Sequence, residues 1–136
     1  MLKISELAGR IGLSAHTIWF YEKHGLIEAS ERSESGYRLY SATDVNRAAF
    51  VKTARNIGFS LEDIAQLLSI RLDRSSHSCQ EVTDITRNKL HEVNRKMAEL
   101  KAMQKVLSRL LDICVGGLVK ATHCSILEVL DKGGIA

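Results

Sequence analysis

The segment from Cys79 to Cys114 contains neither glycine nor proline, and it constrains the fold of this chain more than any other feature. Apolar residues recur in it at alternating spacings of three and four, with Gln104 as the one polar member of the series. This repeat is typical of the a and d positions of a coiled coil. The sequence therefore predicts one helix over 78–113, about 50 Å long at a rise of about 1.5 Å per residue. The stripe consists of Leu90, Val93, Met97, Leu100, Gln104, Leu107 and Leu111.

A helix of this length needs a partner for its apolar stripe. The chain has only 136 residues, and the part outside the helix is too small to cover the stripe. We therefore expect an obligate homodimer, in which the same helix of a second copy packs against the first. The alternative is a helix that breaks at an unmarked point and folds back on itself.

Composition and charge narrow the class of protein. Hydrophobic residues make up 45 % of the chain and charged residues 26 %, which is typical of a folded protein and argues against disorder. No run approaches the roughly 18 apolar residues of a membrane span, so no membrane partner is expected. An acid at Glu6, where a signal peptide would be apolar, favours a cytoplasmic location. The net charge of +3 permits a nucleic-acid partner without demonstrating one.

The first 70 residues are predicted to form a domain of short helices. Apolar residues at helical spacing give a helix that ends at Gly12, and Ser14 is the N-cap candidate of a second helix that ends at Gly25. Together they make a helix-turn-helix over 4–23. The second helix carries side chains suited to phosphates and base edges. The candidate DNA contacts here are Ser14, His16, Thr17, Tyr21 and Lys23. A small amphipathic hairpin of no special function is the alternative.

A β-hairpin is expected immediately after the helix-turn-helix. Two short strands, at 26–30 and 37–40, flank a polar turn, and a hairpin in this place is a wing. Arg32 and Arg38 are candidates to bind backbone phosphates, and Tyr37 is a candidate to lie along a groove. A solvated hairpin with an incidental pair of arginines is the alternative.

Two capping boxes predict the next helices. Ser41 with Asp44 starts a helix that extends to about Ile57, and Ser60 with Asp63 starts another. The first of these helices has a basic edge, which we expect to be solvated rather than to face DNA. The edge consists of Arg47, Lys52 and Arg55.

Three cysteines, an odd number in a chain expected in the cytoplasm, favour metal or redox chemistry over disulfides. If the long helix is continuous, Cys79 and Cys114 of one chain lie too far apart to share a ligand. If two such helices pair antiparallel, Cys79 of one subunit meets both Cys114 and Cys124 of the other subunit. Cys124 is the last residue of the glycine-containing loop 114–124. This pairing gives two equivalent three-thiolate sites across the dimer interface. For each cysteine considered alone, the alternative is a buried thiol with a structural role.

A thiolate-rich site suits zinc, cadmium, lead or mercury. His123, in the loop, or His77, just before the long helix, would complete a tetrahedral site around zinc. Without a nitrogen ligand, a trigonal three-sulfur site favours lead, mercury or cadmium. A short helix at 125–131 is expected to pack the loop against the dimer. The only adjacent cysteine and histidine are Cys124 and His123, and neighbours in sequence seldom face each other, so we do not expect an enzyme.

Four short motifs occur in order along the chain. They are Ile4-Ser5-Glu6-Leu7-Ala8, Thr17-Ile18 with Phe20-Tyr21-Glu22, Gly36-Tyr37-Arg38-Leu39-Tyr40, and Gly58-Phe59-Ser60-Leu61. In sequence and spacing they closely resemble the MerR family of bacterial transcription regulators. The resemblance implies a mainly helical chain: a winged helix-turn-helix DNA-binding domain over 1–70 with its wing at 26–40, then a long antiparallel coiled-coil dimerisation helix and a C-terminal metal-binding loop with a short helix. Trp19 stands where family members usually have an arginine that contacts a phosphate, and an indole here would pack on the sugar-phosphate backbone.

The cysteines extend the resemblance to one branch of the family. Together with the string Cys124-Ser125-Ile126-Leu127, they are similar to those of the zinc-responsive MerR regulators that control zinc efflux. Copper-sensing members usually have serine where Cys79 stands, so the resemblance implies a divalent ion. The zinc regulators usually hold a second zinc with another cysteine and a loop histidine. Because Val115 and Val119 occupy these positions here, a two-metal site is not expected.

The function that the resemblance implies is metal-dependent control of transcription. A homodimer would bind promoter DNA, and the metal-bound form, with zinc as the first expectation, would bend and untwist the promoter so that RNA polymerase reads both of its elements. The regulated gene would encode metal export. The alternatives are a cadmium, lead or mercury regulator of the same family, a constitutive DNA-binding protein with a structural metal, and a redox sensor that uses the same cysteines.

Overall fold

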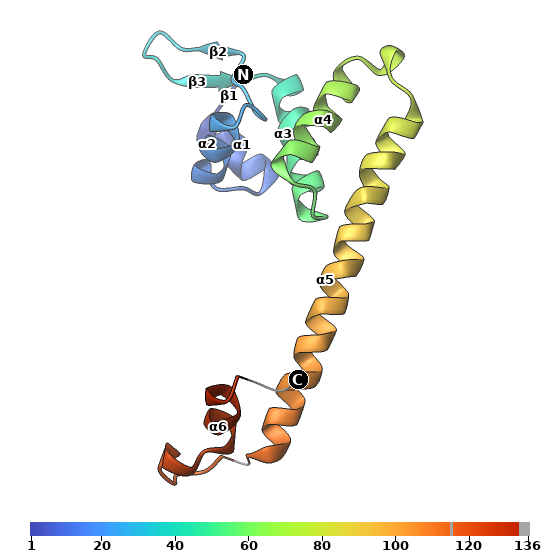
Figure 1. The fold of residues 1–136 in the computed structure, drawn as a ribbon. Helices are drawn as coiled ribbons and strands as arrows, with labels where there is room; N and C mark the ends of the chain where they lie inside the picture. Colours follow the sequence, from blue (N-terminus) through green and yellow to red (C-terminus); the bar gives the residue numbers. More distant parts are fainter. Residues whose placement is uncertain (115, 134–136) are drawn as a thin grey trace. The chain divides into compact units, whose positions relative to one another are not determined.

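The computed structural model describes residues 1–114 and 116–133, so Val115, one of the two valines singled out above, lies outside the described residues. The chain divides into two units, Met1–Lys89 and Leu90–Ala136, and each is described by itself. Figure 1 shows the elements in chain order. They are β1 (Leu2–Lys3), α1 (Ile4–Ile11), α2 (Ala15–Lys23), β2 (Glu31–Arg32), β3 (Arg38–Tyr40), α3 (Ala42–Asn56), α4 (Leu61–Leu72), η1 (Arg74–Ser76), α5 (Cys79–Ile113), η2 (Ala121–His123) and α6 (Ser125–Asp131).

Local capping signals set where the first helices begin. Both predicted capping boxes are present: Ser41 and Asp44 exchange hydrogen bonds at the start of α3, and Ser60 and Asp63 do the same at the start of α4. Ser14 caps α2, because its hydroxyl accepts a hydrogen bond from the backbone N–H of the third helical residue. The predicted starts of these three helices are therefore confirmed.

The core of the first unit lies between its helices and the inner face of the wing. Four helices and β3 contribute to it, and none of the buried residues that the structure describes is charged. The largest fully buried side chains are Tyr40, Leu7, Ile18, Leu26, Ile27, Ile64 and Val51. Because Ile18 of α2 and Tyr40 of β3 both belong to this core, it joins α2 to the wing.

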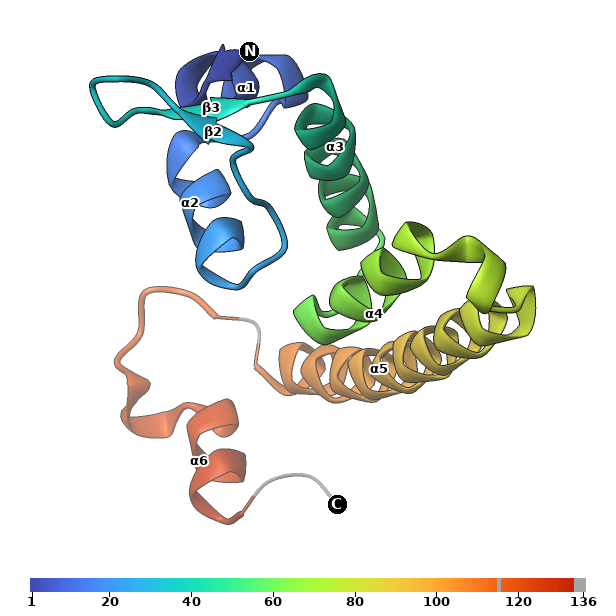
Figure 2. The same cartoon turned by 90° about the horizontal axis from the view of Figure 1, so that it is seen from above.

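The wing is a three-stranded antiparallel sheet in the order β1-β3-β2. The hairpin turn between β2 and β3 projects beyond the helices of its unit in both views (Figures 1 and 2). The strand predicted at 26–30 is wrong, because Leu26 and Ile27 are only 2 % exposed and belong to the core. The carbonyl of Leu26 accepts a hydrogen bond from the Arg47 side chain at 2.8 Å instead of pairing in a sheet. The first hairpin strand lies at Glu31–Arg32.

The long helix is confirmed as one element, α5, of 35 residues. Most of its predicted apolar stripe is exposed in a single chain, with Leu100 at 63 % and Leu111 at 70 %. Near its end, Leu110 is buried within the second unit, which also contains α6. Among the residues described, no helix combines the length and the apolar character that crossing a membrane requires.

Candidate DNA-binding surface and metal centre

The exposed side of α2 carries a ridge of polar and aromatic side chains. Trp19 is 44 % exposed and lies at its centre. The His16 ring stacks against the indole with centroids 5.9 Å apart, and the Lys23 ammonium lies 5.4 Å from the indole centroid. At the start of the helix, the hydroxyls of Ser14 and Thr17 share a hydrogen bond of 2.8 Å. The ridge therefore presents a flat ring flanked by donors, which suits a sugar-phosphate backbone.

Tyr21 lies apart from this ridge. It is predicted above as a DNA contact, yet it is only 6 % exposed and packs in the core. The physical reason is helical periodicity: Tyr21 follows Ile18 by three residues, so both side chains lie on the inner face of α2. Its place is that of a residue that supports the ridge from beneath.

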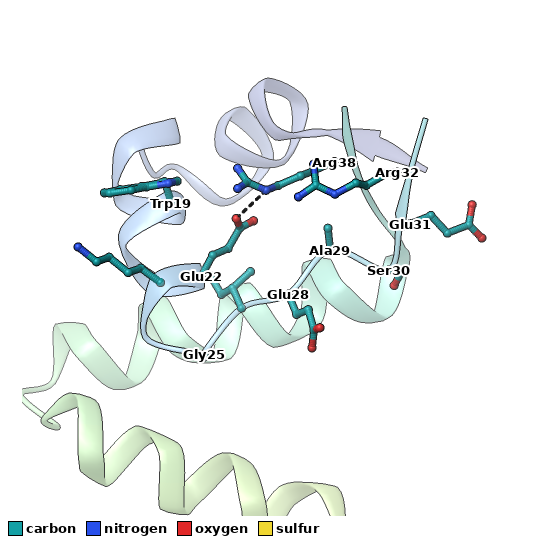
Figure 3. A pocket seen from close by; sticks show the side chains of 11 residues that line it. Trp19, Glu22, Gly25, Glu28, Ala29, Ser30, Glu31, Arg32 and Arg38 are labelled. Carbon is teal, nitrogen blue, oxygen red and sulfur yellow. Dashed lines mark ion pairs between the residues drawn. The ribbon is translucent and has the colours of Figure 1, made fainter. Parts of the chain in front are cut away.

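A hollow of about 710 Å³ separates α2 from the wing, and Figure 3 shows its lining. Arg32 and Arg38 line it from the wing, and Trp19 lines it from α2 (Figure 3). The Nε atom of Arg38 is 3.1 Å from the carboxylate of Glu22. Arg32 also donates a hydrogen bond of 2.9 Å to the carbonyl of Gly36, which braces the hairpin turn.

The basic edge of α3 has a structural role that the sequence did not reveal. Lys52 donates a hydrogen bond of 2.6 Å to the carbonyl of Ile11, at the end of α1. Arg47 binds the carbonyls after α2, and Arg55 donates to the carbonyl of Phe59 at 3.2 Å. The expectation of a solvated edge is therefore wrong for Arg47 and Lys52, which are half-buried, whereas Arg55 is exposed. All three cations donate to carbonyls at the end of α1 or in the segments that follow α2 and α3.

In the second unit the loop brings two of the three predicted sulfur ligands together. The thiol of Cys114, just after α5, donates a hydrogen bond to Cys124, the residue before α6. The pKa of the Cys124 thiol lies below its usual value, chiefly because the backbone N–H of Leu127 donates to its sulfur, with a second such bond from Ile126. The start of α6 thus stabilises a thiolate next to a second cysteine.

A hollow of about 630 Å³ opens beside this pair of cysteines. Its lining includes His123, one of the two candidate nitrogen ligands, and Val119. The two loop glycines, Lys120, Ala121 and Thr122 form the remainder of the lining besides the two cysteines. The hollow is large enough for a metal ion and for a further ligand from outside this loop.

The third cysteine belongs to the other unit. Cys79 is the first residue of α5 and is exposed. With His77 it lines a pocket of about 300 Å³ whose other walls are largely apolar. The Nδ1 atom of His77 lies 3.1 Å from the carboxylate of Glu81, an arrangement that leaves Nε2 as the nitrogen for any ligand role.

The described residues of one chain do not make a complete metal site. Among the described residues, no three His, Cys, Asp or Glu side chains are close enough to hold one ion. The Cys114–Cys124 pair nevertheless fits a thiophilic cation, because two sulfurs in contact, one of them favoured as thiolate, are ligands that soft metals prefer.

Known proteins that are similar to this chain identify its family. Residues 2–70 match the model of the MerR HTH family regulatory proteins, and residues 45–110 match that of MerR, DNA binding. The chain is 45 % identical over 133 residues to the HTH-type transcriptional regulator ZntR of Escherichia coli, which covers 98 % of this chain and 94 % of that protein. It is similar to the crystal structure of the transcription regulator PbrR691 of Ralstonia metallidurans in complex with lead(II), at 33 % identity and a TM-score of 0.81 over 96 % of this chain and 99 % of the other. It is also similar to that of MerR of Bacillus megaterium in complex with mercury(II), at 30 % identity and a TM-score of 0.70 over the same shares. The chain belongs to the MerR family, whose members are transcription regulators and not enzymes.

Proposed function

We propose that this chain is a metal-responsive transcription regulator that binds promoter DNA as a homodimer and senses a divalent soft metal, zinc first, with cadmium, lead and mercury as the alternatives. The observation that carries the proposal is the contact between Cys114 and Cys124 at the start of α6, where a thiolate is stabilised. The similarity to regulators in complex with lead(II) and mercury(II) supports a metal as the signal.

The homodimer rests on the exposed stripe of α5. Apolar side chains that are half exposed or more repeat along this helix, and a stripe of this kind needs a partner helix in water. An antiparallel pairing of 78–113 in two copies would place the start of one helix beside the end of the other. It would therefore bring Cys79 of one protomer to the loop 114–124 of its twin.

The proposed metal site is shared between protomers. Cys79 of one protomer and Cys114 and Cys124 of the other would supply three sulfurs, and the metal, when bound, would act as a cross-link between them. His123 or His77 would add a nitrogen and favour zinc, whereas three sulfurs alone would favour lead, mercury or cadmium. The short helix 125–131 would hold Cys124 in place through its backbone N–H groups.

The proposed DNA-binding domain is 1–70. The exposed side of α2 (Ser14, His16, Thr17, Trp19 and Lys23) and the wing (Arg32, Tyr37 and Arg38) would meet the DNA, and Tyr21 would support them from the core. Tyr37 is 62 % exposed near the hairpin turn, as a groove contact requires. Metal binding would change the arrangement of the two DNA-binding domains in the dimer and so distort the promoter. RNA polymerase would then transcribe a gene for metal efflux. The regulator would act in the cytoplasm.

Competition titration with four metals, combined with transcription in vitro, tests this proposal. The purified dimer without metal is titrated with zinc, cadmium, lead and mercury against a chromophoric chelator, and transcription by RNA polymerase is measured with each ion. Cys114→Ser is expected to keep DNA binding and to abolish metal-induced transcription. Thr122→Ser, which lies in the same loop and changes no thiol, is the matched control and is expected to respond as the wild type does.

Other outcomes would point to other functions. Equal loss of DNA binding and of induction in Cys114→Ser would contradict a separate sensor site. Transcription that ignores every metal would favour a constitutive DNA-binding protein with a structural metal. Induction by peroxide in a medium with chelator would favour a redox sensor.

A further inference from the structure

Two arginines are paired on adjacent strands of the wing. Arg32 on β2 and Arg38 on β3 are direct cross-strand partners, so their side chains lie on the same face of the hairpin. Like charges in this arrangement repel and destabilise a strand pair. Both side chains line the hollow between the wing and α2 (Figure 3), where an anion would relieve the repulsion.

Glu22 supplies one negative charge to this pair from α2. One oxygen of its carboxylate lies 3.1 Å from Nε of Arg38, and the other accepts a hydrogen bond from the hydroxyl of Tyr40. Tyr40 is fully buried. Burial is the larger cause, and this hydrogen bond the second, of a pKa of its hydroxyl above the usual range. The Tyr40 hydroxyl is therefore a fixed donor, and it holds the carboxylate of Glu22 in one orientation.

The Nε contact leaves the outer side of the Arg38 guanidinium available. A guanidinium has five N–H donors in a planar fork, and Nε carries only one of them. With Nε bound to Glu22, the two terminal nitrogens remain for a second acceptor. Two further acids, Glu28 and Glu31, line the hollow, but Figure 3 shows their carboxylates turned away from the arginines.

We propose that Glu22 is a positioning residue for DNA binding: it holds Arg38 by Nε so that the terminal nitrogens of Arg38, together with Arg32, bind one phosphate of the DNA backbone in this hollow. The inference rests on the proposed function, because it requires that this chain binds DNA. It differs from that function in assigning a favourable role to an acid beside the phosphates.

The sign of one substitution separates this role from simple electrostatics. Removal of a carboxylate near DNA should tighten binding if charge alone matters. If Glu22 positions Arg38, Glu22→Gln is expected to weaken binding by roughly tenfold, because the oriented contacts to the phosphate are lost. Glu28→Gln, in the same hollow but away from the arginines, is the matched control and is expected to bind equally well or more tightly.

A double-mutant cycle on DNA affinity tests the coupling. The probe is a fluorescent duplex of roughly 30 base pairs, about three helical turns, selected from a random library by the wild-type protein. In an Arg38→Ala background, Glu22→Gln is expected to change the affinity by less than about twofold. The salt dependence is a second measure: Glu22→Gln and Arg38→Ala are each expected to reduce the slope of log K against log salt by about one.

The results of these measurements distinguish failure of the positioning role from failure of the DNA-binding function. Unchanged or tighter binding by Glu22→Gln, or the same loss in the Arg38→Ala background, overturns the positioning role while DNA binding by the wild type stands. Failure of the wild type to select any duplex overturns the DNA-binding function itself and this role with it. If Glu22→Gln does not fold, Tyr40→Phe keeps the buried ring and removes only the hydroxyl, and it is expected to weaken binding in the same direction, again only when Arg38 is present.

Discussion

The stripe of α5 allows the strength of self-association to be estimated from one side chain. Leu100 lies in the middle of the stripe and is 63 % exposed in a single chain. Full burial of a leucine side chain contributes about 1.5–3 kcal/mol, so covering the exposed part contributes about 1–2 kcal/mol per copy. Because a dimer contains two copies, Leu100→Ala should weaken it by about 2–4 kcal/mol, and the dimer Kd should rise by roughly 30-fold to 700-fold.

Sedimentation equilibrium over a range of concentrations measures this Kd directly. Alanine is a good helix former, so helix content by circular dichroism should stay unchanged at concentrations where the variant still pairs. Glu99→Ala removes a side chain next to Leu100 in sequence but off the stripe, and its Kd should remain within about twofold of the wild type.

Two results would refute this reasoning. A wild-type chain that sediments as a monomer at micromolar concentration would show that the stripe is not covered by a second copy. Equal weakening by Leu100→Ala and Glu99→Ala would show that the stripe has no special part in the association.

Three further predictions concern the first unit. Gly12→Ala should lower the free energy of unfolding by about 1–2 kcal/mol in urea titrations, because Gly12 has φ +71° and a Cβ there would lie 2.9 Å from Nζ of Lys52. Burial raises the pKa of Asp44, but hydrogen bonds from two serines outweigh burial and lower the pKa below 3.8. The ionised carboxylate therefore stabilises the folded state at any pH above the pKa of the unfolded chain. This stabilisation is lost as the pH falls through the lower pKa of the folded state. Asp44→Asn should therefore cost about 1 kcal/mol at neutral pH and progressively less in unfolding titrations below about pH 4. Trp19→Arg, which introduces the residue usual in the family, should steepen the salt dependence of DNA affinity by about one unit, and an unchanged slope would contradict a phosphate near this position.

Local signals made the helices predictable. A serine and an acid three residues later can form a closed set of hydrogen bonds without help from distant residues, and the boxes of Ser41 and Ser60 start α3 and α4 as expected. The continuity of α5 follows from the same kind of information, because nothing between Cys79 and Cys114 interrupts a helical backbone.

Contacts distant in sequence were not predictable in the same way. The segment 26–30 has the apolar residues of a strand, but the core that Leu26 and Ile27 enter is formed by side chains that range from Leu7 to Leu68 in sequence. Lys52 binds the carbonyl of Ile11 across 41 positions, and no local pattern distinguishes it from a solvated lysine. In both cases the tertiary environment decides between two local states of similar energy.

The division of the cysteines between two units has a consequence for how sensing and DNA binding are linked. Cys79 belongs to the unit that contains α2 and the wing, whereas Cys114 and Cys124 belong to the unit that contains the loop and α6. A metal shared between Cys79 of one protomer and the loop of the other would therefore connect a sensor directly to a DNA-binding unit, with no need for a long chain of intermediate contacts. Thermodynamic linkage then applies in both directions. If bound metal raises the affinity for DNA by favouring one arrangement of the two DNA-binding units, bound DNA must raise the affinity for the metal by the same factor. A site built from one protomer alone would lack this direct connection, and its metal would act on DNA only through the helix α5.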